Sequence, residues 1–154
     1  MSRRTRFAVA SAALLGAGIS CSRGPLPPAK LDTKNDTCSV CRMTVSDPRL
    51  ASQVLVPGEE PRFFDDLGCL AKFLEEHQLP DAVLYVADHR TSEWTPAAAA
   101  VYSRLARAST PMASGVIAHA TVESRAEDTG AVGSEIVDAG LVFGGRAATE
   151  GHDQ

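Results

Sequence analysis

Two cysteines and a methionine stand close together in the stretch TCSVCRM, where Cys38 and Cys41 form a Cys-x-x-Cys pair and Met43 follows. Such pairs occur in redox couples, zinc sites, haem attachment motifs and soft-metal sites. Haem attachment is excluded here, because Arg42 stands where an axial histidine would follow the second cysteine. A redox pair is expected at the start of a helix, whose dipole lowers the thiol pKa. The residues after this pair are β-branched and lead into a turn, which does not resemble a helix start.

Only two methionines follow Met1, and both favour a soft-metal site. On an extended strand, the side chains of Cys41 and Met43 would project from one face. Met112 follows Pro111 in the polar loop RASTPMASG, where a methionine is poorly placed to fill a core. Thiolate and thioether donors together select Cu(I), whereas zinc prefers thiolate, imidazole and carboxylate ligands. The sequence therefore predicts a Cu(I) site that includes Cys41, Met43 and Met112.

Two further side chains are candidate ligands. Cys69 falls in the first turn of an expected helix, where the dipole favours the thiolate that a metal needs. Its alternative role is that of a small buried core residue. His119 lies on an expected strand shortly after Met112, so that it can approach the same site.

Two alternatives to a copper site remain open. A structural zinc site of four thiolates lacks its fourth cysteine, so His77 or His119 would have to complete it. A thiol–disulfide oxidoreductase would use Cys38 and Cys41 as its redox couple. The dipeptide Thr110–Pro111 resembles the loop proline that faces the disulfide in thioredoxin-like proteins.

The elements that must position these residues fall into two segments of similar layout. The first segment is expected to run strand, strand, helix, strand, at residues 51–56, 62–66, 66–77 and 82–88. The second is expected to repeat this order, with a weak helix, at residues 99–105, 115–121, 123–137 and 140–145. We therefore predict an α+β fold of two small ββαβ units packed together, at residues 37–97 and 98–145, with a disordered tail at residues 146–154.

The start of the chain predicts export. Residues 1–20 combine the basic MSRRTRF with a short apolar run that ends in GISC, which is typical of a lipoprotein signal peptide. Cys21 would then become the lipidated first residue. Residues 21–36 contain three prolines and are expected to form an extended tether, with a reach of ~45 Å from a membrane surface. The predicted location is the periplasmic side of a bacterial membrane, the outer membrane rather than the inner.

Charge and motif content narrow the function classes. Loss of the three arginines in residues 1–20 would change the formal net charge from −4 to −7. Such an acidic surface argues against nucleic acid as a partner. No nucleophile elbow or phosphate-binding glycine loop is present. The pair Asp65–Asp66 is explained by a helix cap with fewer assumptions than by acid–base catalysis. We therefore expect a tethered carrier and no enzyme.

Two stretches, CSVCRMTVSDPRLASQVLVPGEEPRFFDDLGCLAKFL and the later TPMASGVIAHA, resemble the NosL family. Members of that family are lipoproteins that act as copper chaperones in the assembly of nitrous oxide reductase. The resemblance implies Cu(I) held by cysteine and methionine sulfur, and it allows a histidine. Relatives usually carry glycine at the position of Arg42. The ligands implied are first Cys41, Met43 and Met112, then Cys38 and Cys69, with His119 as the candidate histidine.

The resemblance completes the predicted function. It implies a membrane-anchored chaperone that delivers Cu(I) to a periplasmic copper enzyme. The expected partner is the nitrous oxide reductase machinery. The two ββαβ units that the resemblance implies agree with the layout inferred from the residues themselves.

Overall fold

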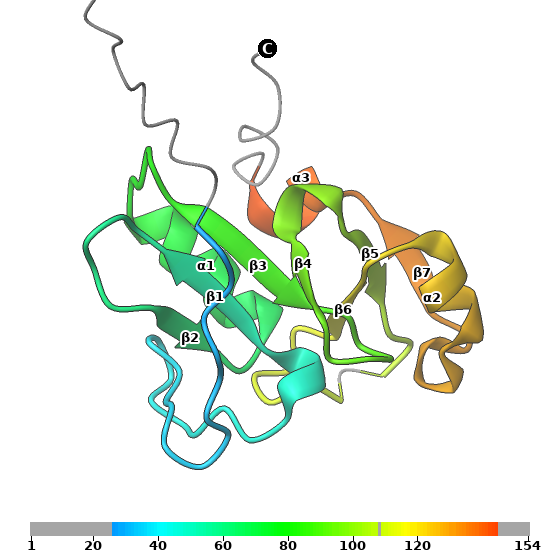
Figure 1. The fold of residues 1–154 in the computed structure, drawn as a ribbon. Coiled ribbons are helices and arrows are strands. Elements are labelled where there is room, and N and C mark those ends of the chain that lie inside the picture. The colour runs from blue at the N-terminus through cyan, green and yellow to red at the C-terminus, as the bar shows by residue number, and fades with distance from the viewer. Residues whose placement is uncertain (1–25, 108, 145–154) are drawn as a thin grey trace, which may run out of the picture.

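The computed structural model describes residues 26–107 and 109–144 (Figure 1). The predicted signal peptide, Cys21 and the predicted tail at residues 146–154 lie outside these residues. The part of the chain up to and including Pro96 forms a four-stranded antiparallel sheet in the order β2-β1-β3-β4. Its elements are a short 3₁₀ turn and then β1, β2, α1, β3 and β4, at Pro48–Leu50, Ser52–Leu55, Arg62–Phe64, Leu67–Glu76, Val83–Ala87 and Trp94–Pro96.

A second, three-stranded antiparallel sheet follows in the order β6-β5-β7. A 3₁₀ turn at Ala97–Ala99 leads into it, and another at Thr129–Ala131 precedes its last strand. The strands and helices of this part are β5, β6, α2, β7 and α3, at Val101–Arg104, Val116–His119, Val122–Glu127, Glu135–Val137 and Ala139–Phe143.

The two parts share one topology, which confirms the predicted α+β fold with two ββαβ units. In each sheet the first strand of the unit lies in the middle and pairs antiparallel with the second and the third. Ser52 of β1 pairs with Phe64 and Val86, and Tyr102 of β5 pairs with Ala118 and Val137 in the same way. Strand β4 is an addition to the first unit that the sequence did not predict.

The last element of the second unit differs from its prediction. Residues 140–145 were expected to form a strand, but helix α3 occupies Ala139–Phe143 and the strand β7 precedes it. Asp138 caps α3 by accepting a hydrogen bond from the Gly140 N–H, and Gly144 ends it in the left-handed conformation at φ 61°. A short apolar run does not distinguish helix from strand. Here the Asp138 cap and the left-handed Gly144 at the two ends of the segment favour the helix.

One hydrophobic core joins the two units. Helix α1 packs on the first sheet and also contacts α3 and β6 of the second unit. Phe143 of α3 lies edge-on against the ring of Tyr102, at 5.2 Å between ring centroids, and both side chains are buried. Phe64 and Phe73 stack at a tilt inside the first unit, 5.1 Å apart. Because the core is shared, loops of one unit can be held against helices of the other.

The predicted helix at residues 66–77 is confirmed as α1. Asp66 is its N-cap, and the buried residues Leu67, Leu70 and Leu74 recur at helical spacing toward the core. His77 is the C-cap, and Pro80 follows it. The cap and the apolar stripe together fix where α1 begins and which face it buries.

Residues 26–36 lie against the first sheet on the face opposite α1 (Figure 1). The Gln53 side chain exchanges two hydrogen bonds with the backbone of Ala29, at 2.8 and 3.2 Å. The Tyr85 hydroxyl donates to the carbonyl of Leu26 at 2.8 Å. The tether predicted over residues 21–36 was therefore wrong for this part. The proline-rich composition suggested a free linker. An extended segment can nevertheless dock on a sheet when side chains of that sheet form hydrogen bonds with its backbone groups.

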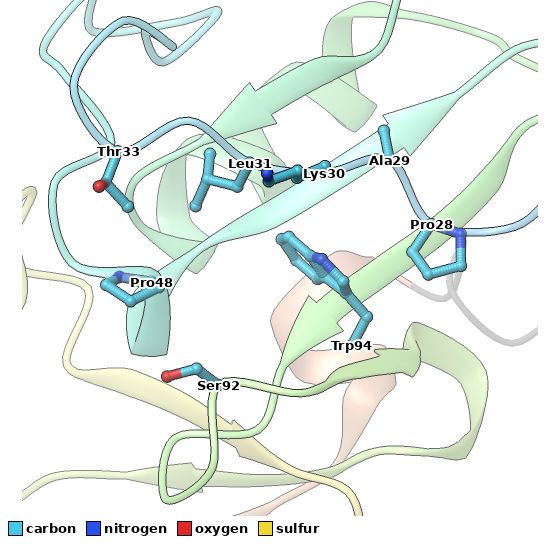
Figure 2. Close-up of a pocket in the computed structure, with 8 residues that line it drawn as sticks. All are labelled: Pro28, Ala29, Lys30, Leu31, Thr33, Pro48, Ser92 and Trp94. Atoms are coloured by element: carbon cyan, nitrogen blue, oxygen red, sulfur yellow. The ribbon is translucent and has the colours of Figure 1, made fainter.

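A hollow of about 360 Å³ lies between this segment and Trp94 (Figure 2). Lys30 contributes its only charged side chain, and no cysteine, histidine or carboxylate lines it, so its lining lacks the usual metal ligands. Among the helices that the structure describes, none has the length and apolar character needed to cross a bilayer.

Candidate metal centre

The Cys-x-x-Cys pair lies in a tight turn. The N–H of Cys38 donates to the carbonyl of Met43 at 2.8 Å, and the N–H of Arg42 donates back to the carbonyl of Cys38 at 3.0 Å. Arg42 has φ 66°, the left-handed region that favours glycine. The predicted extended strand, with Cys41 and Met43 on one face, was therefore wrong. Glycine would adopt that φ without a Cβ clash, so the turn favours glycine at this position on physical grounds.

Three thiols and one carboxylate converge beside this turn. One ligand atom from each of Cys38, Cys41, Asp65 and Cys69 lies within 4.8 Å of the others. The Cys41 thiol donates to the Asp65 carboxylate, with Sγ–O distances of 3.2 and 3.3 Å. All three cysteines are free thiols. We call these four residues the sulfur cluster.

Three separate segments build the sulfur cluster. The turn supplies Cys38 and Cys41, and Cys38 forms an isolated parallel bridge with Phe63 of β2. Asp65 directly follows β2, and Cys69 lies in the first turn of α1, as predicted. The cluster therefore sits where the strand ends, the helix begins and the turn closes over both.

Burial dominates the electrostatics of the thiols. Cys38 and Cys69 are buried, and Cys41 is partly exposed. Burial raises the pKa of Cys41 to about 11, and interactions with Cys38 and Asp65 add to the rise, while the Met43 backbone N–H opposes it. Burial, followed by the neighbouring Cys38, also raises the pKa of Cys69. The expectation that the helix dipole would favour the Cys69 thiolate was therefore wrong, because desolvation outweighs the dipole.

The loop that carries Met112 is fastened to the start of α1 by Asp66. One oxygen of Asp66 accepts from the Gly68 N–H at 2.6 Å and thereby caps the helix. The other accepts from the Thr110 hydroxyl at 2.6 Å and from the Met112 N–H at 2.8 Å. Burial alone would raise the pKa of Asp66, but these hydrogen bonds, with one from Ser114, outweigh burial and lower it. We call this arrangement the Asp66 latch.

The close fit of this loop also depends on a glycine. A Cβ added at Gly68 would lie 2.9 Å from the Cβ of Ser114, closer than real Cβ contacts come. Any side chain at Gly68 would therefore push the loop away from α1. The latch and this contact together hold the Met112 loop against the start of α1, where Cys69 lies three residues after Asp66.

The two methionines lie at the surface, Met43 after the turn that carries Cys41 and Met112 in the loop that is fastened to Asp66. Met43 is 43 % exposed and Met112 is 50 % exposed. Each is next to a residue in the left-handed region, Arg42 at φ 66° and Ala113 at φ 58°. Such conformations cost on the order of 1 kcal/mol each and concentrate at functional sites. Both loops therefore hold their methionine outward in a backbone shape that the chain would otherwise avoid.

Comparison with protein-family models gives one match, to NosL, over residues 28–138. The chain belongs to the NosL family. The match begins in the docked N-terminal segment and ends at Asp138, so it covers both units. No curated protein and no solved structure matched the chain. NosL proteins are copper-binding accessory proteins and not a known class of enzyme, which confirms the resemblance inferred from the sequence.

The donors in this NosL chain fit a soft metal ion. Three sulfur atoms within reach of one another match the ligand softness that Cu(I) prefers, and the single carboxylate is a harder donor. Thiols with raised pKa values are neutral at pH 7, so a metal ion must displace their protons to bind. The same neutrality opposes thiol–disulfide exchange, which requires a thiolate.

The structure does not group His119 with the sulfur cluster. Its ring meets His89 and Asp128 instead, in a second group of potential ligands. His77 is likewise absent from the cluster and stacks on Phe73 at the end of α1. The fourth position beside the three thiols belongs to Asp65.

Asp65 is the residue of the cluster that the sequence did not single out. The pair Asp65–Asp66 was assigned as a whole to a helix cap, and Asp66 alone makes that cap. The signal was the second carboxylate, which the cap does not need. Asp65 directly precedes the Asp66 cap. It therefore lies between the end of β2 and the first helical turn of α1, which carries Cys69.

Proposed function

We propose that this NosL protein is a Cu(I) carrier that takes up one ion at the sulfur cluster and passes it to a partner by ligand exchange. The observation that carries the proposal is the convergence of ligand atoms of Cys38, Cys41 and Cys69 within 4.8 Å. The turn that holds Cys38 and Cys41 leads into the half-exposed Met43, and the loop fastened to Asp66 carries the half-exposed Met112. Each thiol that binds the ion loses one proton to solvent and binds as a thiolate, and it takes up a proton again when the ion leaves.

The methionines have a separate role in this proposal. A thioether carries no proton and stays a ligand at any pH, and it binds Cu(I) in preference to harder cations. Met43 and Met112 are exposed enough to meet an incoming donor, whereas Cys38 and Cys69 are not. The ion would therefore enter and leave through the thioethers and rest on the thiols.

A competition titration with a Cu(I)-specific chelator, run in parallel with Zn(II), tests this function. We expect Met43→Leu and Met112→Leu to weaken Cu(I) binding by ~10-fold and to leave Zn(II) binding almost unchanged. Ile136→Leu is the control, because Ile136 is an exposed apolar residue of the second unit, outside the cluster, and should change neither. Equal losses for both metals would identify a zinc module, and no loss for either would exclude the thioethers.

The proposal includes a lipid anchor at Cys21, on the periplasmic side of a bacterial membrane. The support is the sequence of residues 1–21 alone, a basic start, a short apolar run and small residues before the cysteine. Cell fractionation of the wild type and of Cys21→Ser tests it. Recovery of both proteins in the same membrane fraction would contradict the anchor.

The recipient that we propose is nitrous oxide reductase. The support is membership of the family and the sulfur donors that suit Cu(I). The test is the copper content of nitrous oxide reductase purified from cells that lack this chain. Restoration by the wild type but not by Cys69→Ser is the expected result, and full copper content in the deletion strain would overturn the assignment.

A further inference from the structure

A second group of potential ligands lies apart from the sulfur cluster. A single oxygen of Asp128, Oδ2, lies 2.6 Å from Nδ1 of His89 and 2.9 Å from Nε2 of His119. The two rings lie edge to face, with 6.0 Å between their centroids. Three potential ligand atoms thus lie within 4.8 Å of one another.

Three segments from both units build this group. His89 follows β3 of the first unit, His119 ends β6, and Asp128 lies between α2 and the 3₁₀ turn of the second unit. The N–H of His89 donates to the carbonyl of Ala118 at 2.8 Å, which holds its backbone on β6. The other oxygen of Asp128 accepts from the Gly130 N–H at 2.8 Å. The donors are therefore fixed by backbone contacts of their own.

The hydrogen bonds of the group are incomplete. His119 is fully buried, and its Nδ1 atom has no hydrogen-bond partner among the described residues. An ion bound through Nε2 of His119 would leave this Nδ1 atom unpaired, so the ligand set consists of Nδ1 of His89, Nε2 of His119 and Oδ2 of Asp128. Within the described part of the chain, the side-chain hydrogen-bond partners of the Asp128 carboxylate are the two imidazoles.

We propose that His89, His119 and Asp128 form a second metal site, for a divalent cation of borderline softness such as Zn(II). Two imidazoles and one carboxylate are a three-ligand set that zinc accepts while keeping a fourth position open. Around a tetrahedral ion with bonds of ~2.0–2.1 Å, ligand atoms stand ~3.3 Å apart. The 2.6 and 2.9 Å distances need only a small outward movement of the rings to reach that spacing.

Donor chemistry separates this site from the sulfur cluster. Nitrogen and oxygen donors favour borderline divalent ions, whereas the thiols and thioethers favour Cu(I). The His89 side chain is 11 % exposed and that of Asp128 is 9 % exposed, so the ion would enter on their side. A bound ion would link the end of β3 to α2 and to β6, and so join the two units. This inference does not depend on the copper function.

The ring NMR signals of His89 and His119, followed while Zn(II) is added to the whole reduced chain, test the site. We expect both rings to shift with one equivalent, whatever happens at the cysteines. Asp128→Asn and His89→Gln should weaken the response by at least the ~10–100-fold that losing an outer partner of a ligand costs. His77→Gln is the control, since that ring stacks on Phe73 outside the group.

The outcomes are distinct. Ring signals that do not move with Zn(II) would overturn the site, as would an equal response in His89→Gln and His77→Gln. If Asp128→Asn fails to fold, His89→Gln decides, because His89 is the most exposed of the three side chains. A third check is thermal: the wild type should melt at a higher temperature with Zn(II), and His89→Gln should lose that increase.

Discussion

The two ββαβ units share a topology but differ in the chemistry at the start of the helix. Cys69 lies three residues after the N-cap of α1, and Ser124 lies three residues after the N-cap of α2. The first position contributes a thiol to the sulfur cluster, and the second contributes a hydroxyl that donates to Asp88 at 2.6 Å. The scaffold therefore fixes where a side chain points, and the residue type decides between a ligand and a structural hydrogen bond.

The two units also hold each other by similar means. Asp66 of the first unit caps α1 and fastens the Met112 loop of the second. Asp88, at the end of β3, accepts from the Ala120 N–H and the Ser124 hydroxyl at the start of α2. In each case a buried carboxylate of the first unit satisfies donors of the second. The two helices differ in how much they bury, because α1 buries five side chains and α2 buries only Ser124.

The largest expected effect is on Cu(I) affinity, when the equivalent helix positions Cys69 and Ser124 are each substituted. Cys69→Ser should lower Cu(I) affinity by more than ~100-fold, because it removes a ligand and not merely an outer partner of one. Ser124→Ala, the matched change in the second unit, should leave Cu(I) affinity unchanged. A Cu(I) chelator competition measures both. Similar losses in the two variants would show that the units are not chemically distinct.

Loss of the Asp66 latch should destabilise the protein by about 2–3 kcal/mol. In Asp66→Asn, an N–H₂ group that accepts no hydrogen bond replaces one carboxylate oxygen, so that either Gly68 or the pair Thr110 and Met112 loses its acceptor. Urea unfolding measures the change. Asp47→Asn is the control, because the Asp47–Arg49 pair is exposed and should contribute less than ~1 kcal/mol. An equal effect of the two changes would contradict the latch.

Asp88 should make stability depend on acid pH. Burial would raise its pKa, but hydrogen bonds from Ala120, Ser124 and two further N–H groups lower it to about 2 from an ordinary 3.8. The unfolded chain then binds the proton more readily, so stability is present above about pH 4 and is lost as pH falls toward 2.

This contribution amounts to about 2 kcal/mol. Unfolding free energies measured from pH 5 to pH 2 should fall less steeply in Asp88→Asn than in the wild type. Parallel curves for the two proteins would show that the carboxylate makes no such contribution.

The smallest expected effect is a gain in stability at the turn. Arg42→Gly should stabilise the protein by about 0.5 kcal/mol, because glycine relieves a left-handed conformation at some cost in unfolded-state entropy. Lys72→Gly, at an exposed position inside α1, should instead destabilise by about 1 kcal/mol. Thermal melting of the two variants measures both changes. If Arg42→Gly also destabilised the protein, the left-handed conformation of Arg42 would not be a source of strain.

Local patterns were enough to predict much of the fold. The cap at Asp66 and the apolar spacing after it predicted α1, and the two similar segments predicted both ββαβ units. The prediction failed for α3, where contacts at the two ends of the segment select helix over strand. It also failed for residues 26–36, which dock on the first sheet although their composition is that of a linker. Those outcomes depend on partners distant in the sequence, which periodicity does not reveal.

The sequence by itself determined the donors, namely the cysteine pair, Cys69, the two methionines and their similarity to NosL. Only the tertiary structure decided which donors meet. It brought Asp65 to the thiols and took His119 away to His89 and Asp128. It also set the protonation of the thiols, because burial raises the pKa of Cys41 and Cys69 whatever their neighbours in the chain. The physical reason is that desolvation and convergence are properties of packing, and packing joins residues 24 to 39 positions apart.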